Sequence, residues 1–523
     1  MSNRLHIIFA FIVIANSLSA QEFMLKSNYK DVNDLYNIYK ESNNPTFIEK
    51  VRFNTLTDIK INYNHKSGDF HRVDEESINN GVGFNLYGIK KYNKLSFEGS
   101  FNYNYNKEKS KRWNSTLLPS NENPFIISDK VYSDFITEQF FLNGGVAYQF
   151  SPQITGGLRA SLKSGSSAND SDPRPNINGI RFNINPGFSI KGDKNTFGLS
   201  FEYERLSESI EYMYVENHPE NTVYLMSGIS ESKNNPALSY KRRYFGNNFG
   251  GSLQWAHEIN SSKSNFMELS YTNILEKAED GAMIDCYKGG DFCNNKITFT
   301  NRYYWNNNIF RHQLQLNVNA NIIKGTSYEQ EQGYDKNMQL VWKTKRKYST
   351  HEENNIKADL SYRFDKINDS LSIYTLLGKV GFIYDKIKDP STKSSTEFSS
   401  IFINAQGAYN FSFDIYRLKT SLSAKYNLRL TDKFNVDYKS LSTPHSIMAN
   451  NYIRPIYAYN SASYLQMQVR AELQRPIKIK NGSTWLGVFA QYDFTNYMDN
   501  YKALKALYPI INGSRHYIET GIN

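Results

Sequence analysis

Apolar and polar side chains alternate with a period of two along most of this chain. In 312–323, for example, Leu314 and Leu316 alternate with Gln315 and Asn317. Successive side chains of a strand point to opposite faces, so such a segment has one apolar and one polar face. The same pattern recurs in 136–150, 178–191, 354–366, 416–430 and 464–473. These segments predict an all-β protein.

The connections between the alternating segments fall into two lengths. Short ones, such as Ser151-Pro152, use turn residues, whereas long polar stretches such as 108–135 and 431–460 follow every second strand. Nine long and eight short connections join eighteen strands. Outer-membrane barrels sort their connections in this way, with short periplasmic turns and long external loops. We therefore predict a transmembrane antiparallel up-and-down β-barrel of about 18 strands over 54–523, with an exported soluble β-sandwich or propeller as the alternative.

The N-terminal part of the chain does not alternate. Arg4, the apolar run 5–15 and the small residues after it are typical of a cleavable signal peptide over 1–20. Residues 21–53 are predicted to be a periplasmic N-terminal segment, in which 31–40 could form one short helix. An even number of strands places both termini in the periplasm and the barrel in the outer membrane.

Composition narrows the class of protein further. The 523 residues include 39 Tyr and 33 Phe, yet the mean hydropathy is −0.61. After the leader, no stretch supplies the ~20 consecutive apolar residues that a membrane-spanning helix needs. The aromatic content argues against disorder, and two cysteines exclude a disulfide-dense scaffold.

Three sequence blocks resemble a known family: Arg112-Trp113-Asn114, Asp172-Pro173-Arg174-Pro175-Asn176 and Tyr240-Lys241-Arg242-Arg243-Tyr244-Phe245-Gly246. The chain resembles an uncharacterised family of outer-membrane β-barrels of Bacteroidetes-type bacteria, which carries only a domain-of-unknown-function label. The resemblance covers 21–523 and implies an envelope role that could lie beside TonB-dependent uptake systems, without a catalytic residue. One departure is the end of the chain, Ile522-Asn523, where many such barrels have an aromatic residue. That implies another insertion signal or further residues.

If the apolar faces meet lipid, the charged residues of the opposite faces point into the lumen of the barrel. The predicted lumen-lining residues are Arg159, Lys163, Arg181, Lys191, Glu202, Glu204, Lys357, Asp359, Arg363, Lys419, Lys425, Arg429, Arg470 and Glu472. Such a lining could select anionic or polar solutes, because rings of charge set the selectivity of a pore. The alternative is that these charges pair across neighbouring strands and fill the barrel.

Two further groups fall in predicted long loops. Cys286 and Cys293 are predicted to form a loop disulfide, because the chain is exported and no histidine pair stands nearby to complete a zinc site. The basic clusters 241–243 and 343–347 favour contact with anionic lipopolysaccharide over nucleic acid. A solvated loop is the simpler explanation of both clusters.

Signals for an enzyme are thin. His445-Ser446 and His351-Glu352-Glu353 are the nearest approaches to a nucleophile–base or acid pair. We expect no catalytic activity, cofactor or metal, and a barrel that passes a polar or anionic solute. The alternatives are a plugged barrel that binds a partner or ligand through its external loops and, third, a surface hydrolase. The expected partners are outer-membrane lipid, lipopolysaccharide and the barrel-assembly machinery, with a TonB-dependent receptor as a further candidate.

Overall fold

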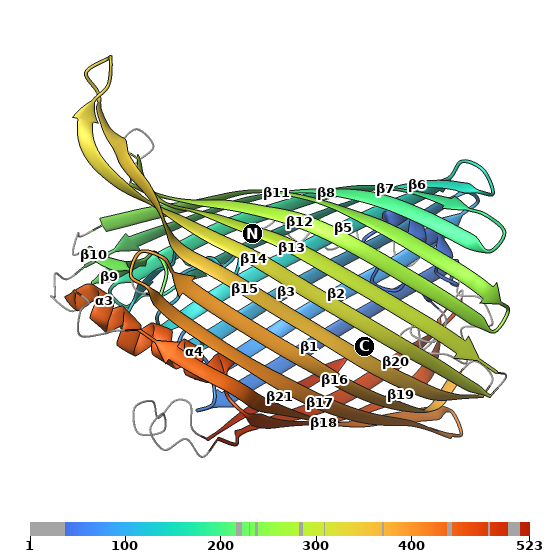
Figure 1. The fold of residues 1–523 in the computed structure, drawn as a ribbon. Coiled ribbons are helices and arrows are strands. Elements are labelled where there is room, and N and C mark those ends of the chain that lie inside the picture. The colour runs from blue at the N-terminus through green and yellow to red at the C-terminus, as the bar shows by residue number, and fades with distance from the viewer. Residues whose placement is uncertain are drawn as a thin grey trace.

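The computed structural model describes residues 37–215, 222–229, 231–235, 239–281, 286–307, 309–368, 371–436, 442–479, 482–499 and 513–523. Eighteen of its antiparallel strands form one closed barrel (Figure 1). In order around the wall they are β1 (Thr55–Gly68), β2 (Ile78–Tyr92), β3 (Leu95–Lys111), β5 (Ser133–Gln149), β6 (Ile154–Ala168), β7 (Arg174–Lys191), β8 (Asn195–Met213), β11 (Ser239–Asn260), β12 (Lys263–Gly281), β13 (Cys286–Asn306), β14 (Phe310–Tyr334), β15 (Leu340–Asn368), β16 (Leu371–Asp389), β17 (Ser394–Phe413), β18 (Tyr416–Asn435), β19 (Tyr464–Ile479), β20 (Gly482–Tyr497) and β21 (Ser514–Ile522). The predicted fold is confirmed.

The barrel closes because β1 pairs on both of its edges. Tyr63 of β1 lies opposite Val82 of β2 on one side and opposite Thr520 of β21 on the other. Closure leaves the wall without a free sheet edge over these pairs, which is the condition for placing strands in lipid.

Tight turns gather at one end of the barrel and longer connections at the other (Figure 1). Asn93, between β2 and β3, and Asp414, between β17 and β18, both have a φ of 51°. Asn and Asp tolerate this left-handed conformation, which two-residue hairpin turns require. The predicted alternation of short and long connections is therefore present in the fold.

The outer surface of the wall is apolar and the inner surface is polar. Ile403, Leu422 and Val488 are 56%, 59% and 57% exposed. Such a band of exposed aliphatic and aromatic side chains on a closed barrel is suited to lipid rather than water. Within the described parts of the chain, no helix is long and apolar enough to cross a bilayer.

Some inward-facing polar side chains bond one another along the wall. Gln313 donates to Gln315 (2.8 Å), Gln315 donates to Asn317 (2.9 Å), and Asn317 donates to Asp359 of the next strand (2.9 Å). A polar lumen is stable when such groups are hydrogen-bonded. The amide-rich alternation of 312–323 therefore forms a ladder of side-chain hydrogen bonds.

The longer connections at the second end are folded rather than open. Three short strands, β4 (Ile127–Asp129), β9 (Val223–Met226) and β10 (Ser232–Asn235), form a separate sheet in the order β10-β9-β4. Helices α3 (Thr443–Met448), η4 (Ala449–Ile453) and α4 (Arg454–Asn460) lie at the same end, between β18 and β19 (Figure 1). These six elements, with residues 112–126 that lead into β4, are called the cap below.

The N-terminal segment occupies the tight-turn end. Its 3₁₀-helix η2 (Pro45–Lys50) lies inside the barrel (Figure 1), and residues 37–53 are called the plug below. The predicted signal peptide lies outside the described residues. So does most of the helix predicted over 31–40, whose described end is a turn closed by the hydrogen bond from the Lys40 N–H to the Asn37 carbonyl (3.2 Å).

Several strands run further than the alternation indicated. The stretch 325–353, predicted as a loop, is mostly paired, and β14 and β15 continue beyond the barrel as a two-stranded ribbon that carries the basic cluster 343–347 (Figure 1). The cluster 241–243 likewise lies on β11. Outside the lipid both faces of a strand can be polar, so the sequence pattern vanishes while pairing continues.

The predicted disulfide is wrong. Cys286 and Cys293 both lie on β13, and both thiols are free. Seven residues of extended strand span about 23 Å, whereas a disulfide needs Cα atoms about 4.4–6.8 Å apart. The error has the same origin, because 277–295 was predicted to be a loop and is mostly strand.

The outward assignment can be tested on β18. Replacing both Leu422 and Leu428 by Arg should block assembly into the membrane, since each lipid-facing Arg near mid-bilayer costs about 2–4 kcal/mol. The matched control places Arg at the inward Ser421 and Ser423. Heat-modifiable migration in gel electrophoresis measures folded barrel, and equal loss in both double variants would contradict the assignment.

Candidate functional site

The plug is anchored to the wall through Asn44. Its side-chain oxygen accepts from the Thr46 N–H (3.0 Å) and so caps η2. Its amide nitrogen donates to the carbonyls of Phe188 on β7 (3.0 Å) and Leu199 on β8 (3.2 Å), and to Gln254 Oε1 on β11 (3.0 Å). One buried side chain therefore orders the helix start and ties it to three wall strands.

The wall makes room for η2 with inward-facing glycines. A Cβ at Gly157 on β6 would lie 2.8 Å from the Thr46 nitrogen, and one at Gly187 on β7 would lie 2.4 Å from Asn44 Oδ1. Gly145 on β5 and Gly198 on β8 would meet the plug at 2.8 Å in the same way. These four glycines, on four consecutive strands, are called the glycine shelf below.

Charged groups of the wall hold the residues that precede η2. Glu268 on β12 accepts from the Ser42 hydroxyl (2.5 Å) and the Asn43 N–H (3.2 Å). Arg302 on β13 donates to the carbonyl of Lys40 and lies 3.6 Å from Glu41. Beside them, Tyr39 stacks on Phe47 with 4.4 Å between ring centroids. Phe47 also packs with Ala256 and Phe266 of the wall, so the plug meets the wall through apolar as well as polar contacts.

The cap is held by two buried carboxylates of the wall. Glu208 on β8, 1% exposed, accepts from the N–H groups of Leu117 (3.1 Å) and Leu118 (2.7 Å). Glu276 on β12, 0% exposed, accepts from the Ser120 N–H (3.1 Å) and Asn123 Nδ2 (2.8 Å). A buried carboxylate is stable only with such donors, so these contacts fix the path of 117–123 across the lumen.

An apolar core then joins the cap to the inner wall. Phe125 and Ile127 of the cap pack among inward-facing apolar residues of the wall, namely Phe135, Ile177, Ile210, Tyr212, Tyr244, Ala278, Phe292 and Ile323. The Tyr244 hydroxyl donates to the Phe125 carbonyl (2.6 Å). A Cβ at Gly290, whose φ is 156°, would lie 2.1 Å from the Phe125 ring. The end of the lumen is therefore packed like a protein interior.

The helices of the cap belong to a second apolar core. Met448, Tyr452 and Ile453 pack with Trp113 and with Met226 of β9. The Tyr452 hydroxyl donates to Asp74 (3.3 Å), which also accepts two hydrogen bonds from Arg72 (2.9 and 2.8 Å). This polar contact ties α3, η4 and α4 to the connection between β1 and β2.

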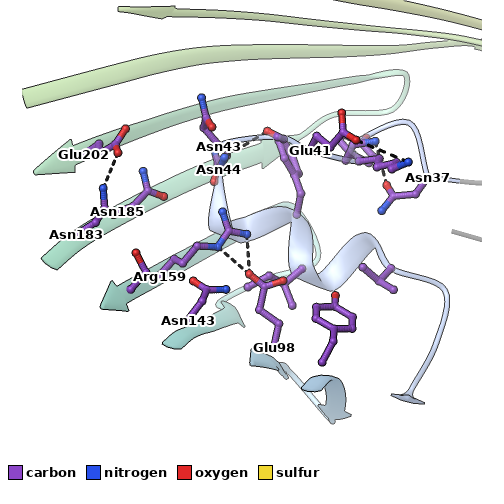
Figure 2. Close-up of a pocket in the computed structure, with 18 of the residues that line it drawn as sticks. Asn37, Glu41, Asn43, Asn44, Glu98, Asn143, Arg159, Asn183, Asn185 and Glu202 are labelled. Atoms are coloured by element: carbon purple, nitrogen blue, oxygen red, sulfur yellow. Dashed lines mark hydrogen bonds and ion pairs between the residues drawn. The ribbon is translucent and has the colours of Figure 1, made fainter. Parts of the chain in front are cut away.

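A chamber of about 540 Å³ lies on the lumen side of the plug. Its floor includes Tyr39, Asn43 and Asn44, and its walls come from β2, β3 and β5 to β8. The wall residues are Tyr87, Glu98, Phe141, Asn143, Arg159, Ser161, Asn183, Asn185, Glu202 and Glu204. Figure 2 shows amide and carboxylate side chains of neighbouring strands around this space.

Most charges of the chamber already have partners. Arg159 donates to Glu98 through Nε (2.7 Å), as the dashed lines in Figure 2 show. Glu204 accepts from Arg181 Nη1 and Asn248 Nδ2 (both 2.7 Å). Glu202 accepts from Asn183. The lining has four carboxylates, including Glu41, against the two cations Lys40 and Arg159.

The fourteen residues predicted to line the lumen occupy the strand faces opposite the exposed apolar side chains. Three of them, Arg159, Glu202 and Glu204, meet at the chamber. Arg181 lies between wall and cap, because it contacts Glu204, the Leu118 carbonyl and Glu276. The three predicted residues at the chamber therefore come from two strands, β6 and β8.

The other predicted residues lie elsewhere on the wall. Local partners are found for Asp359 (Lys379), Arg363 (Asp365), Lys425 (Tyr464), Arg429 (Asp432 and Asp499) and Arg470 (Glu472). Lys163, Lys191, Lys357 and Lys419 are also outside the chamber lining. Asp359 pairs with a cation of the neighbouring strand, whereas Arg363 and Arg470 pair with carboxylates of their own strands. Both the filling of the lumen by charge pairs and a role in solute selection stay predictions.

Sequence reasoning missed the residues that fill the lumen. Asn44, Glu208, Glu268 and Glu276 were not predicted, and neither was the glycine shelf. A signal was present, because the inward-facing positions change from polar to apolar near the cap, as at Phe135 on β5, and to glycine near the plug. Such a change at the inward-facing positions of several strands predicts that a segment of the chain packs inside the barrel.

The histidines considered for catalysis make local contacts. His445 Nδ1 bonds the Ser442 hydroxyl (2.7 Å) in the first turn of α3, while the Ser446 hydroxyl accepts from Asn450 (3.4 Å). His351 Nε2 lies 3.1 Å from Glu353. Over the described ranges, no group of three His, Cys, Asp or Glu side chains could hold a metal ion.

Fold and site together define a plugged β-barrel of the outer-membrane type. The chain belongs to the family of unknown function DUF6850, whose model matches residues 45–523. The match begins at the first residue of η2, so the family includes the plug helix as well as the barrel. The resemblance to an uncharacterised family is thus confirmed, while the bacterial group stays a prediction.

No curated protein matches the chain in sequence. Among solved structures, it is similar to the ferric citrate transporter FecA (TM-score 0.42, 10% identity, 88% of this chain and 78% of that chain covered). It is also similar to the RagAB peptide transporter (TM-score 0.40, 7% identity, 87% and 78% covered). A third is BauA, the ferric preacinetobactin receptor from Acinetobacter baumannii (TM-score 0.40, 8% identity, 90% and 80% covered). Both the TM-score and the sequence identity are low for all three structures.

The stability of the cap should depend on pH through Asp129 of β4. Burial raises the pKa of Asp129 from 3.8 to about 7, although the Val131 N–H favours the charged form. The folded cap then holds the proton more tightly than the unfolded cap, so its stability falls as pH rises from about 4 to about 7 and is level above that. Hydrogen–deuterium exchange, corrected for intrinsic rates, should show protection of 113–129 falling about tenfold or more. The variant Asp129→Asn should reduce this fall, and an unchanged profile would refute the assignment.

Proposed function

We propose that this protein is a gated outer-membrane barrel that takes a polar solute into the chamber and passes it when the plug leaves the lumen. One observation carries the proposal: folded material occupies both ends of the lumen, with a polar chamber between. A permanently open pore would need neither insert. The proposal gives the chain no catalytic role.

The plug is better suited to move than the cap. The cap is joined to wall strands on both sides of its segments and shares two apolar cores with the molecule. The plug is joined to the described wall at β1 alone. It is held by hydrogen bonds and by two apolar clusters that have fewer residues than the cores of the cap. Polar contacts can be exchanged for water at a small net free energy, typically about 0.5–1.5 kcal/mol each.

The plug lies at the tight-turn end, which in outer-membrane barrels faces the periplasm. The proposal therefore places both termini there and the cap at the cell surface, beside lipid and lipopolysaccharide. A periplasmic partner that pulls on the plug, of the TonB-dependent kind, completes it. Insertion would proceed through the barrel-assembly machinery.

The glycine shelf supplies the test. Gly157→Leu should displace η2, because the Cβ alone would fall 2.8 Å from the Thr46 nitrogen and 2.9 Å from the Pro45 carbonyl carbon. The matched control is Gly144→Leu on β5, where a Cβ meets nothing within 4 Å. In planar bilayers the native protein and the control should be silent or open rarely, and Gly157→Leu should give steady conductance steps.

Two outcomes would overturn the proposal. Large steady steps from the native barrel would make it an open pore. Silence of a folded Gly157→Leu barrel would favour the alternative, a barrel that stays plugged and binds a ligand or partner from outside. Heat-modifiable migration shows that each variant is folded.

A further inference from the structure

One hydrogen-bond acceptor of the chamber is unsatisfied, and a carboxylate beside it accepts a hydrogen bond but forms no ion pair with the described residues. Asn185, 6% exposed, donates its amide nitrogen to the Phe201 carbonyl (2.7 Å), which fixes the orientation of the amide. Its oxygen Oδ1 is buried and receives no hydrogen bond from the described protein groups. A buried acceptor without a donor is costly, so it marks a place where a ligand or water supplies one.

Glu202, on the neighbouring strand β8, carries this carboxylate. It accepts a hydrogen bond from Asn183, and among the described residues no lysine or arginine nitrogen lies within 4.0 Å of its carboxylate. Figure 2 places Glu202, Asn183 and Asn185 on adjacent strands at the same side of the chamber. The amide and the carboxylate thus line one side of the same space.

The cations that line the chamber are already engaged. Arg159 binds Glu98, and Lys40 lies 3.7 Å from Glu41. An anionic solute would have to break one of these pairs and would still face Glu202. A cationic solute would instead find a carboxylate and an amide oxygen, which are the partners that N–H donors prefer.

We infer that the chamber binds a small organic cation that has a primary amine or a guanidinium at the end of a short aliphatic body. The charged end donates to Glu202 and Asn185 Oδ1, and the body lies against Tyr87 and Phe141, which also line the space. A volume of about 540 Å³ suits a small molecule. This inference rests on the proposed function, names its solute class, and replaces the expectation of an anionic solute.

Calorimetry on the full mature chain, refolded in detergent, tests the charge preference. The probes are agmatine, which has an amine and a guanidinium, neutral 1,4-butanediol and anionic succinate. Agmatine should bind about tenfold or more tightly than the other two, because hydrogen bonds to charged groups are the stronger ones. Equal binding of all three, or preference for succinate, would overturn the inference.

The variant Glu202→Gln keeps the shape of the side chain and removes its charge. It should weaken agmatine binding about tenfold or more. The matched control is Asp493→Asn on β20, on the opposite side of the barrel, where the carboxylate accepts from Gln491 and does not line the chamber. Its affinity for agmatine should be that of the native protein. An equal loss in both variants would refute the role of Glu202.

Two readouts separate this inference from the proposed function. In the opened Gly157→Leu barrel, the reversal potential in a salt gradient should show cation preference, and adding Glu202→Gln should reduce it. A conducting barrel that neither prefers cations nor binds agmatine would leave gating intact and reject the cation site. If Glu202→Gln does not fold, the ranking of the three probes on the native protein decides alone.

Discussion

The structure depends on one constraint, that a wall built of strands in lipid must turn its apolar face outward. Every strand of the barrel then delivers polar side chains to the lumen, because the side-chain period is two. A lumen of this kind cannot be filled by hydrophobic collapse alone. What enters it must bring donors and acceptors that match those of the wall, as Asn44 and the backbone of 117–120 do.

The two inserts meet this constraint in different ways. Near the cap the inward-facing positions of the wall become apolar, and residues such as Phe135 and Ile323 build an apolar core there. Near the plug the wall has glycines on β5 to β8, and polar side chains such as Glu268 hold the insert. The cap packs against the wall in two large apolar cores, whereas the plug combines hydrogen bonds with two small apolar clusters. This difference in contacts is the reason why we propose that the plug moves and the cap stays in place.

Much of the barrel could be predicted from the sequence. A strand with lipid on one side alternates apolar and polar residues, and short and long connections alternate between the strands. The prediction failed where that asymmetry ends. Cys286 and Cys293 were assigned to a loop because strands above the lipid are polar on both faces. The candidate site was predicted only in part. Arg159, Glu202 and Glu204 were predicted because they lie on the polar faces of their strands. The unsatisfied Asn185 depends on which strands are neighbours and on what the plug covers, and a single strand does not carry that information.

The glycine shelf restricts which segments of this chain can be exchanged with those of other family members. The bulk absent from β5, β6, β7 and β8 is supplied by the side chains of Asn44, Pro45 and Ile48 and by the backbone of Pro45 and Thr46. The plug helix and these four strands are therefore complementary in shape. A chimera that takes the N-terminal segment of one family member and the barrel of another should be well formed only when these four strands travel with it, and a change at one of the glycines should be inherited together with a compensating change in the segment.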